Sequence, residues 1–168
     1  MLSLPGIQQN VRLASYTSYN IGGPADYFVT VHSTDELITA IATARKAGTP
    51  YFILGAGANI LMADKGFRGL VIHNQADTAR LLPSHQLWAE GGAIIADLIE
   101  LGRVHDLSGL EHFVGIPSSV GGAIWQNLHF LSPDRQTTCY ISDCVISASI
   151  LTEDGNVETV NKNFFDFG

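Results

Sequence analysis

The chain has 168 residues, a formal net charge of −7, and a composition that is 46% hydrophobic and 15% charged. This length is enough for one compact domain or two small lobes, and the composition predicts an ordered core. The nine Lys and Arg residues are scattered, which argues against a nucleic-acid partner because phosphate backbones need a basic face. A small anionic ligand remains compatible with an acidic protein, since positive potential can exist locally.

Cys139 and Cys144 are the only cysteines, and four residues separate them. This spacing matches neither a redox pair nor half of a zinc site, so we expect two free thiols in a reducing compartment and no metal. The N-terminal residues lack a basic start followed by an apolar segment, and no apolar run reaches membrane length. The sequence therefore predicts a soluble, cytoplasmic protein without a membrane partner.

A β-α-β unit is predicted in the first half of the chain. Residues 25–32 are apolar and β-branched, which favours a strand. The segment 33–48 begins with the capping box "STDE", continues with apolar residues at helical spacing, and ends at Gly48, which suits a left-handed turn. Further strands are expected at 51–54 and 69–74. The length of the crossover suits a parallel pair.

The second half is expected to start after a boundary within 75–86. Residues 87–93 predict a strand that ends on a glycine pair, and residues 94–109 predict a helix with one apolar stripe. The segment "SVGGAIWQN", 119–127, starts a short helix. Residues 144–161 predict a β-hairpin, because β-branched residues flank the turn "DGN".

Helices and strands alternate early in the chain and strands cluster late, which predicts an α+β or a mixed α/β fold, and we take α+β as the fold class. We expect two lobes, with residues 1–75 forming the β-α-β lobe and residues 76–168 forming the second lobe.

The segment "GAGANI", 55–60, directly follows the strand expected at 51–54. Glycines at such a place let backbone N–H groups approach a phosphate, as in the dinucleotide-binding fingerprint. That fingerprint fits poorly, because Ile60 occupies the place of its third small residue and Gly66 and Gly69 interrupt the helix that should follow. Two interpretations stay open on local grounds, an anion-binding turn of consecutive N–H groups and an ordinary tight turn.

Two further glycine clusters occur elsewhere in the chain. The segment "GIPSSVGGA", 115–123, combines a proline, two serine hydroxyls that can donate to phosphate oxygens, and a glycine pair that permits a flat group to lie against backbone. Its alternative interpretation is a tightly packed turn that leads into a helix. The segment "YNIGGPADYF", 19–28, places a third cluster directly before a strand. Loops gathered at one end of a sheet commonly build a ligand crevice.

Taken in order, the segments "SYTSYNIGGPADYF", "FILGAGANILMADKGFRGLVI" and "LSGLEHFVGIPSSVGGAIWQN", followed by "NFFDFG", resemble the family of UDP-N-acetylenolpyruvoylglucosamine reductases (MurB) of peptidoglycan synthesis. The resemblance runs from Tyr16 to the last residue. It implies an FAD-binding fold of the vanillyl-alcohol-oxidase/PCMH type, in which two α+β lobes hold the flavin and a third domain binds a UDP-sugar substrate. It also implies that NADPH delivers hydride to the flavin and that the flavin passes it to the enolpyruvyl double bond.

The resemblance also indicates which residues contact FAD. The first loop matches the pyrophosphate loop of the family, and the segment 115–123 matches a second FAD segment with the Asn that follows it. The opening glycine motif is expected to serve structure first and the cofactor second. The implied cofactor-binding residues are Ile21, Gly22, Gly55, Ala56, Gly57, Ala58, Asn59, Ile60, Ile116, Pro117, Ser118, Ser119, Gly121, Gly122, Ala123 and Asn127. Glu111 lies just before the second segment, where a structural or solvated carboxylate is an equally good interpretation.

This chain departs from the family after Asn127. A short glycine-rich turn is replaced by the bulkier and longer segment 128–143, which either reshapes the flavin-ring edge through His129 or Arg135 or forms a surface insertion. The catalytic Arg of the family, its later Ser or Cys acid, a Glu and the substrate domain would all follow Gly168. No catalytic residue is therefore assigned within the chain.

Loss of those groups removes the charge stabilisation that the reaction requires. We therefore expect the cofactor-binding part of such an enzyme, without reductase turnover, and with an exposed apolar face that favours self-association.

Two other functions remain as alternatives. A flavin-dependent oxidase of the same fold often tethers its flavin through His or Cys near the first glycine loop, and neither occurs within residues 54–61. A non-catalytic nucleotide-binding module would keep the fold and lose the chemistry, and the unusual segment 128–143 agrees with that.

Overall fold

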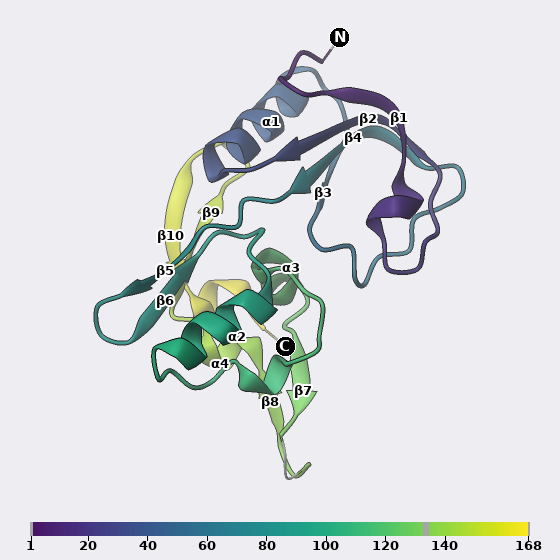
Figure 1. The fold of residues 1–168 in the computed structure, drawn as a ribbon. Helices are drawn as coiled ribbons and strands as arrows, with labels where there is room; N and C mark the ends of the chain where they lie inside the picture. The colour runs from purple at the N-terminus through teal and green to yellow at the C-terminus, as the bar shows by residue number, and fades with distance from the viewer. Residues whose placement is uncertain (1, 133–134, 168) are drawn as a thin grey trace.

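The first half of the chain forms a four-stranded sheet whose strands, in spatial order, are β1 (Gln8–Arg12), β2 (Pro24–Val31), β4 (Phe67–Asn74) and β3 (Tyr51–Leu54) (Figure 1). The computed structural model describes residues 2–132 and 135–167. β1 runs antiparallel to β2, whereas β2, β4 and β3 run parallel to one another. The predicted strands at 25–32, 51–54 and 69–74 are thereby confirmed.

α1 (Thr34–Lys46) packs against this sheet and begins at the predicted cap. The Ser33 hydroxyl oxygen accepts a hydrogen bond from the N–H of Glu36, 3.2 Å away. The Glu36 carboxylate accepts in return from the N–H of His32 at 2.8 Å, so the reciprocal bond lies one residue earlier than a standard capping box places it. Gly48 adopts a φ of +62°, which confirms the predicted left-handed end of the helix.

Replacing Ser33 by Ala is expected to lower the free energy of unfolding by about 1 kcal/mol, because the N–H of Glu36 loses its acceptor. Urea titration followed by circular dichroism measures the change. The Ser33→Asp variant supplies another acceptor and should retain wild-type stability. An equal loss in both variants would show that the hydroxyl does not act as a cap.

β4 lies between β2 and β3, so the prediction of a parallel pair holds for strand direction and is wrong for adjacency. Ile72 of β4 pairs with Val29 on one side and with Ile53 on the other. The crossover through α1 places β3 two strand positions from β2. The position between them is taken by β4, which follows the glycine loop in the chain. That later insertion is a non-local event that no pattern within residues 25–54 encodes.

The sheet has an apolar core on each face, as the two-residue period of a strand requires. Leu70 and Ile72 of β4 pack with the buried residues of α1. Val71 points to the opposite face and packs with Phe28 and Leu54. Each of these side chains is fully buried, and each contributes roughly 1.5–3 kcal/mol through removal of apolar surface from water.

The described residues of the second half form three α-helices and three two-stranded antiparallel pairs. α2 (Ile95–Val104) and α3 (Val120–Trp125) confirm the predicted helices, and β9 (Ser147–Leu151) with β10 (Val157–Asn161) confirms the hairpin. The predicted strand at 87–93 is β6 (Gln86–Ala89). A third apolar cluster lies here and consists of Ile95, Phe113, Ala123, Leu128 and Ile141.

β5 (Ala79–Leu82) pairs with β6, although the segment 75–86 was expected to hold a boundary. The two strands form a short antiparallel hairpin. The Arg80 guanidinium lies 4.6 Å from the ring centroid of Trp88 across the pair. This cross-strand contact involves a charged residue, so the segment lacks the apolar alternation that reveals a strand in sequence.

The remaining elements are short. The hairpin of residues 129–131 and 138–140 extends from the lower end of the molecule in Figure 1, and the described part of its tip ends at residues 132 and 135. The elements are η1 (Leu13–Tyr16), η2 (Glu111–Phe113), β7 (His129–Leu131), β8 (Thr138–Tyr140), α4 (Ile141–Cys144) and η3 (Lys162–Phe165).

Both cysteines are free thiols, as predicted. None of the helices in the described ranges has the length and apolar character needed to cross a bilayer.

Polar contacts made by α1 help to join the halves of the chain. The buried carboxylate of Glu90, just after β6, accepts from the N–H and hydroxyl of Thr34 at 2.9 and 2.7 Å and from the N–H of Thr78 at 3.2 Å. The Arg45 guanidinium of α1 donates to the carbonyls of Thr152 and Glu153 in the β9–β10 turn. Together they fix α1 against the second half. The division into lobes at residue 75 stays a prediction.

Candidate functional site

The first glycine loop meets the second glycine segment where the two halves of the chain face each other. A Cβ built on Gly55 would lie 2.3 Å from the Ser119 hydroxyl oxygen, so only a glycine permits this approach without a shift of that side chain. Residues that are more than sixty positions apart in the sequence thereby touch. The expected gathering of these two clusters is present in the structure.

The backbone of the first loop offers a series of unengaged donors. Within the described residues, no N–H from Gly55 to Leu61 donates a hydrogen bond to another protein group. Gly57 adopts a φ of +67°, which turns the chain inside this run. Successive free N–H groups in a turn with a left-handed residue form a concave anion-binding surface. The geometry favours the anion-binding interpretation over an ordinary tight turn, whose N–H groups are commonly paired.

The opening glycine motif and the residue before it hold this loop and the residues after it through backbone hydrogen bonds. The N–H of Ser18 donates to the Gly57 carbonyl at 3.0 Å, and the N–H of Gly23 donates to the Ala63 carbonyl at 2.9 Å. Gly22 is buried, and a Cβ added to it would lie 2.8 Å from the Met62 side chain. These contacts give Gly22 a structural role, because a larger residue would not fit there. Ile21 beside it is 45% exposed.

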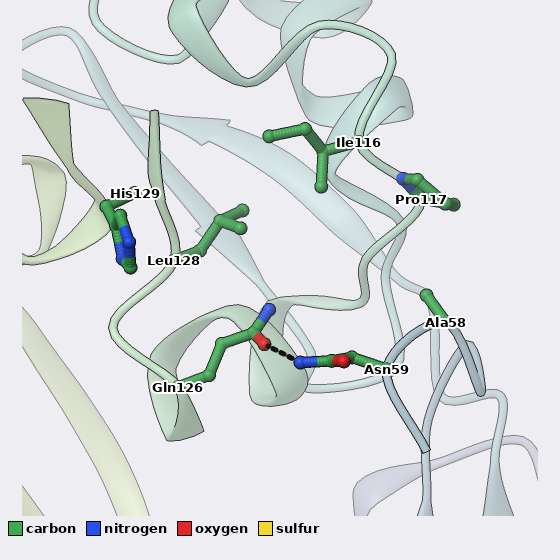
Figure 2. A pocket seen from close by; sticks show the side chains of 7 residues that line it. All are labelled: Ala58, Asn59, Ile116, Pro117, Gln126, Leu128 and His129. Carbon is green, nitrogen blue, oxygen red and sulfur yellow. Dashed lines mark hydrogen bonds between the residues drawn. The ribbon is translucent and has the colours of Figure 1, made fainter. Parts of the chain in front are cut away.

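A cavity of about 360 Å³ lies beside the point where the loops meet, and Figure 2 shows the side chains that line it. Asn59 from the first loop and Gln126 from the end of α3 meet across its edge. The Asn59 amide nitrogen donates to the Gln126 amide oxygen at 2.9 Å. The lining residues are Ala58, Asn59, Ile116, Pro117, Gln126, Leu128 and His129. Its size lies within the range of about 300–1,000 Å³ that small-molecule pockets occupy.

The cavity brings together four of the residues expected to contact a cofactor, namely Ala58, Asn59, Ile116 and Pro117. Gly55, Ala56 and Gly57 precede them in the loop. Ile60 packs with its side chain against the apolar cluster of Leu54 and Phe28.

The hydroxyl groups of the two serines in the second segment form hydrogen bonds with backbone groups of that segment. The Ser118 hydroxyl donates to the Ser119 carbonyl at 3.1 Å, and the Ser119 hydroxyl oxygen caps α3 by accepting from the N–H of Gly122 at 3.3 Å. Both side chains are buried. The N–H of Gly121 donates to the Gly91 carbonyl at 2.8 Å, and Ala123 is fully buried. This part of the segment therefore also matches the tightly packed turn that leads into a helix.

Asn127 lies outside the cavity lining and holds a left-handed turn, with a φ of +43°. Its amide oxygen accepts from the N–H of Ser142 at 3.4 Å, which fixes the start of α4. Glu111 likewise has a structural arrangement, because its carboxylate accepts from the N–H of Gly109 and the hydroxyl of Ser108. The hydrogen bond from Gly109, with further help from Ser108, lowers the pKa of Glu111.

Gln126 and Leu128 line the cavity and were missed by sequence reasoning. Both flank Asn127, and the end of a short helix beside an expected cofactor segment was the one available signal. The segment 128–143 forms the β7–β8 hairpin and α4, and His129 at its start faces the cavity. Arg135 is exposed and is not among the lining residues. The segment thus contributes Leu128 and His129 to the cavity wall and continues as a projecting hairpin.

Comparison with known proteins places these features in a family. Residues 25–161 match the model of the FAD binding domain family. The chain is 33% identical to a UDP-N-acetylenolpyruvoylglucosamine reductase of Clostridium novyi (strain NT), over 95% of this chain and 50% of that protein. It is also 33% identical to the corresponding protein of Streptococcus pyogenes serotype M49 (strain NZ131), over 96% of this chain and 53% of that protein. The chain therefore spans about half the length of the curated relatives it matches.

Solved structures agree with this assignment. The crystal structure of UDP-N-acetylenolpyruvylglucosamine reductase (MurB) from Thermus caldophilus superimposes with a TM-score of 0.71 at 28% identity, covering 96% of this chain and 55% of that one. A 6-hydroxy-D-nicotine oxidase from Arthrobacter nicotinovorans gives a TM-score of 0.69 at 14% identity, covering 97% and 37%, and shares the fold alone. The predicted two-lobed FAD-binding fold of the vanillyl-alcohol-oxidase type is thereby confirmed. The chain belongs to the FAD binding domain family, and it resembles the FAD-binding portion of UDP-N-acetylenolpyruvoylglucosamine reductases.

Proposed function

We propose that this chain is the FAD-binding portion of a UDP-N-acetylenolpyruvoylglucosamine reductase (UDP-N-acetylmuramate dehydrogenase), an oxidoreductase of peptidoglycan synthesis. The observation that carries the proposal is the meeting of the two glycine segments beside one cavity, with unengaged N–H groups along the first loop. FAD needs both features, because its diphosphate requires donors and its ring system requires a largely apolar slot.

The residues present fit this cofactor. The N–H groups of the turn from Gly55 to Leu61 would hold the diphosphate without a charged side chain. The apolar side chains of Ile116, Pro117 and Leu128 would face the ring system. Asn59 and Gln126 offer further polar groups at the cavity edge. When bound, FAD supplies the two-electron chemistry that moves hydride from NADPH to an enolpyruvyl double bond.

A polypeptide of these 168 residues is expected to bind FAD and to lack reductase turnover. The residues that the family resemblance makes catalytic, an Arg, a Ser or Cys and a Glu, do not match positions within it. Such groups stabilise developing charge, and the loss of one typically costs about 10²–10³ in rate. Consumption of NADPH that depends on UDP-N-acetylenolpyruvoylglucosamine would contradict this expectation.

FAD titration tests the proposed function. The purified protein, reconstituted with FAD, should show a flavin absorption spectrum, and denaturation should release free FAD. The Ala56→Glu variant places a carboxylate at an exposed position in the donor turn, so its FAD affinity should fall about tenfold or more by charge repulsion. The Ala42→Glu variant makes the same change on the exposed face of α1 and should bind FAD as the wild type does. A protein that cannot be reconstituted with FAD would overturn the proposal.

Denaturation of the FAD-bound protein and an activity assay separate the alternatives. An oxidase that tethers its flavin would retain FAD after denaturation, and residues 54–61 contain no His or Cys for such a bond. A non-catalytic module would bind FAD and stay inactive even when joined to a substrate-binding domain. The complete open reading frame, assayed with NADPH and the UDP-sugar, distinguishes that function from a reductase.

The proposal includes the setting of the protein. We infer a cytoplasmic location, small-molecule partners, namely FAD, NADPH and the UDP-sugar substrate, and no nucleic-acid or membrane partner. Three large apolar side chains close to the site, Leu61, Val114 and Trp125, are 72%, 73% and 91% exposed. Self-association of the 168-residue polypeptide through such residues is the expected behaviour in solution.

A further inference from the structure

The buried carboxylate of Glu90 joins the two halves of the chain, and its two oxygens accept from different segments. Oε1 accepts from the N–H of Thr34 at 2.9 Å and from the Thr34 hydroxyl at 2.7 Å. Oε2 accepts from the N–H of Thr78 at 3.2 Å. Thr34 is the first residue of α1, where N–H groups lack partners within the helix. The carboxylate thus caps α1 from a position 56 residues away in the chain.

The backbone that follows Glu90 runs antiparallel beside the second glycine segment and holds it with hydrogen bonds of 2.8–2.9 Å. Each bond runs from an N–H to a carbonyl, and the pairs are Ile95 to Ser118, Val120 to Ala93, and Gly121 to Gly91. Ser119, which lies within the held stretch, places its hydroxyl against Gly55 of the first glycine loop. Glu90 is therefore linked through backbone to the contact between the two loops.

The stretch 90–95 is also held at the end of the sheet. The N–H of Gly92 donates to the Ala76 carbonyl at 2.9 Å, and a Cβ added to Gly92 would lie 2.7 Å from backbone atoms of Ala76. The stretch is thus fixed on two sides, by α1 through the Glu90 carboxylate and by the residues after β4 through backbone. Glu90 is not among the seven residues that line the cavity, so it would act on a ligand there only through the loops.

We infer that Glu90 is a positioning residue for FAD binding, because its carboxylate holds the stretch 90–95 and thereby determines where the second glycine segment meets the first glycine loop. This inference rests on the proposed function. A ligand held by both segments binds well only when they keep their spacing to within about 0.5 Å. Loss of the bonds to Thr34 would let the stretch 90–95 move relative to α1, so bound FAD would dissociate faster.

FAD titration of variants at both ends of this contact tests the inference. Glu90→Gln leaves one oxygen for the donors of Thr34 and Thr78, so its FAD dissociation constant should rise about fivefold to tenfold. Thr34→Val removes only the hydroxyl donor and should raise the constant about threefold. Thr34→Ser keeps that donor and should bind FAD as the wild type does. The double variant Thr34→Val/Glu90→Gln should bind no more weakly than Glu90→Gln, because both changes act on one contact.

A matched control separates positioning from general stability. The double variant Ser33→Ala/Gly48→Ala weakens both ends of α1 and leaves the bonds of Glu90 in place. Its expected loss of stability is similar to that of Glu90→Gln. Apparent affinity falls only in proportion to the fraction of competent protein, which stays near one in every variant that circular dichroism shows to be folded. The control should therefore keep the wild-type FAD dissociation constant.

The comparison also distinguishes a failure of this inference from a failure of the proposed function. A wild-type dissociation constant in Glu90→Gln, or an equal rise in the control, would overturn the inference and leave the proposed function standing. If Glu90→Gln does not fold, equal FAD binding by Thr34→Val and Thr34→Ser would overturn the inference. Absence of FAD binding by the wild type would overturn the proposed function, and this inference with it.

Discussion

Gly57→Ala is expected to destabilise the protein by about 3 kcal/mol or more and to prevent FAD binding. Gly57 has a φ of +67°, which costs an L-residue about 1 kcal/mol or more. In addition, the new Cβ would lie 1.9 Å from the carbonyl oxygen of Tyr16, a backbone atom that cannot move aside alone. Relief of this clash would move the loop away from the backbone at Tyr16, and such a shift typically costs about 1–3 kcal/mol more.

Gly48→Ala provides the matched control. Gly48 has a nearly equal φ of +62°, but a Cβ added there meets no atom within 4 Å. Its expected loss is therefore only the conformational term, about 1 kcal/mol. Urea unfolding of both variants gives the difference, and FAD titration gives the effect on the loop. Equal losses in the two variants would show that the contact with Tyr16 is unimportant.

Glu90→Gln is expected to lower the free energy of unfolding by about 2 kcal/mol at pH 7. The carboxylate is only 8% exposed and accepts three hydrogen bonds from Thr34 and Thr78, and bonds to a charged group are worth about 1.5–3 kcal/mol. The Gln amide has only one oxygen that can accept from these donors. Its NH₂ group would face the donors that the second carboxylate oxygen served. Glu158→Gln on the exposed strand β10 is the control and should leave stability unchanged within error.

The same residue gives a pH dependence with a defined sign. Burial alone would raise the pKa of Glu90, but the hydrogen bonds from Thr34 and Thr78 outweigh burial and lower it. The folded chain therefore binds this proton less readily than the unfolded chain. The stabilisation is complete above the ordinary carboxyl pKa of 4.5 and is lost as the pH falls through the lowered value. Thermal unfolding at pH 7 and at pH 3–4 should differ more for the wild type than for Glu90→Gln.

Local signals made much of the fold predictable from sequence. The cap at Ser33, the turn at Gly48 and the "DGN" hairpin each depend on residues within a few positions of one another. The turn of the first glycine loop was predictable for the same reason, whereas its unpaired N–H groups became apparent only in the structure. The ordered set of three clusters then indicated the family, which the comparisons confirm.

Non-local arrangements escaped prediction. The place of β4 between β2 and β3 depends on pairing across the whole first half. β5 was missed because Arg80 over Trp88 replaces an apolar alternation. In the site, the bond between Asn59 and Gln126 joins segments that no local pattern connects.

The position of β4 also determines how the first half assembles. β2 and β3 precede β4 in the chain but contact each other only through it, so pairing of the three strands depends on the last of them. The stretch from Gly55 to Gly66 connects β3 to β4, so we expect it to reach its final shape once these two strands have paired. Contacts between sequence-distant strands form slowly, and segments that become ordered after the folding barrier act mainly on the rate of unfolding. We expect this loop to become ordered late in folding, so a ligand bound to it would slow unfolding rather than speed folding.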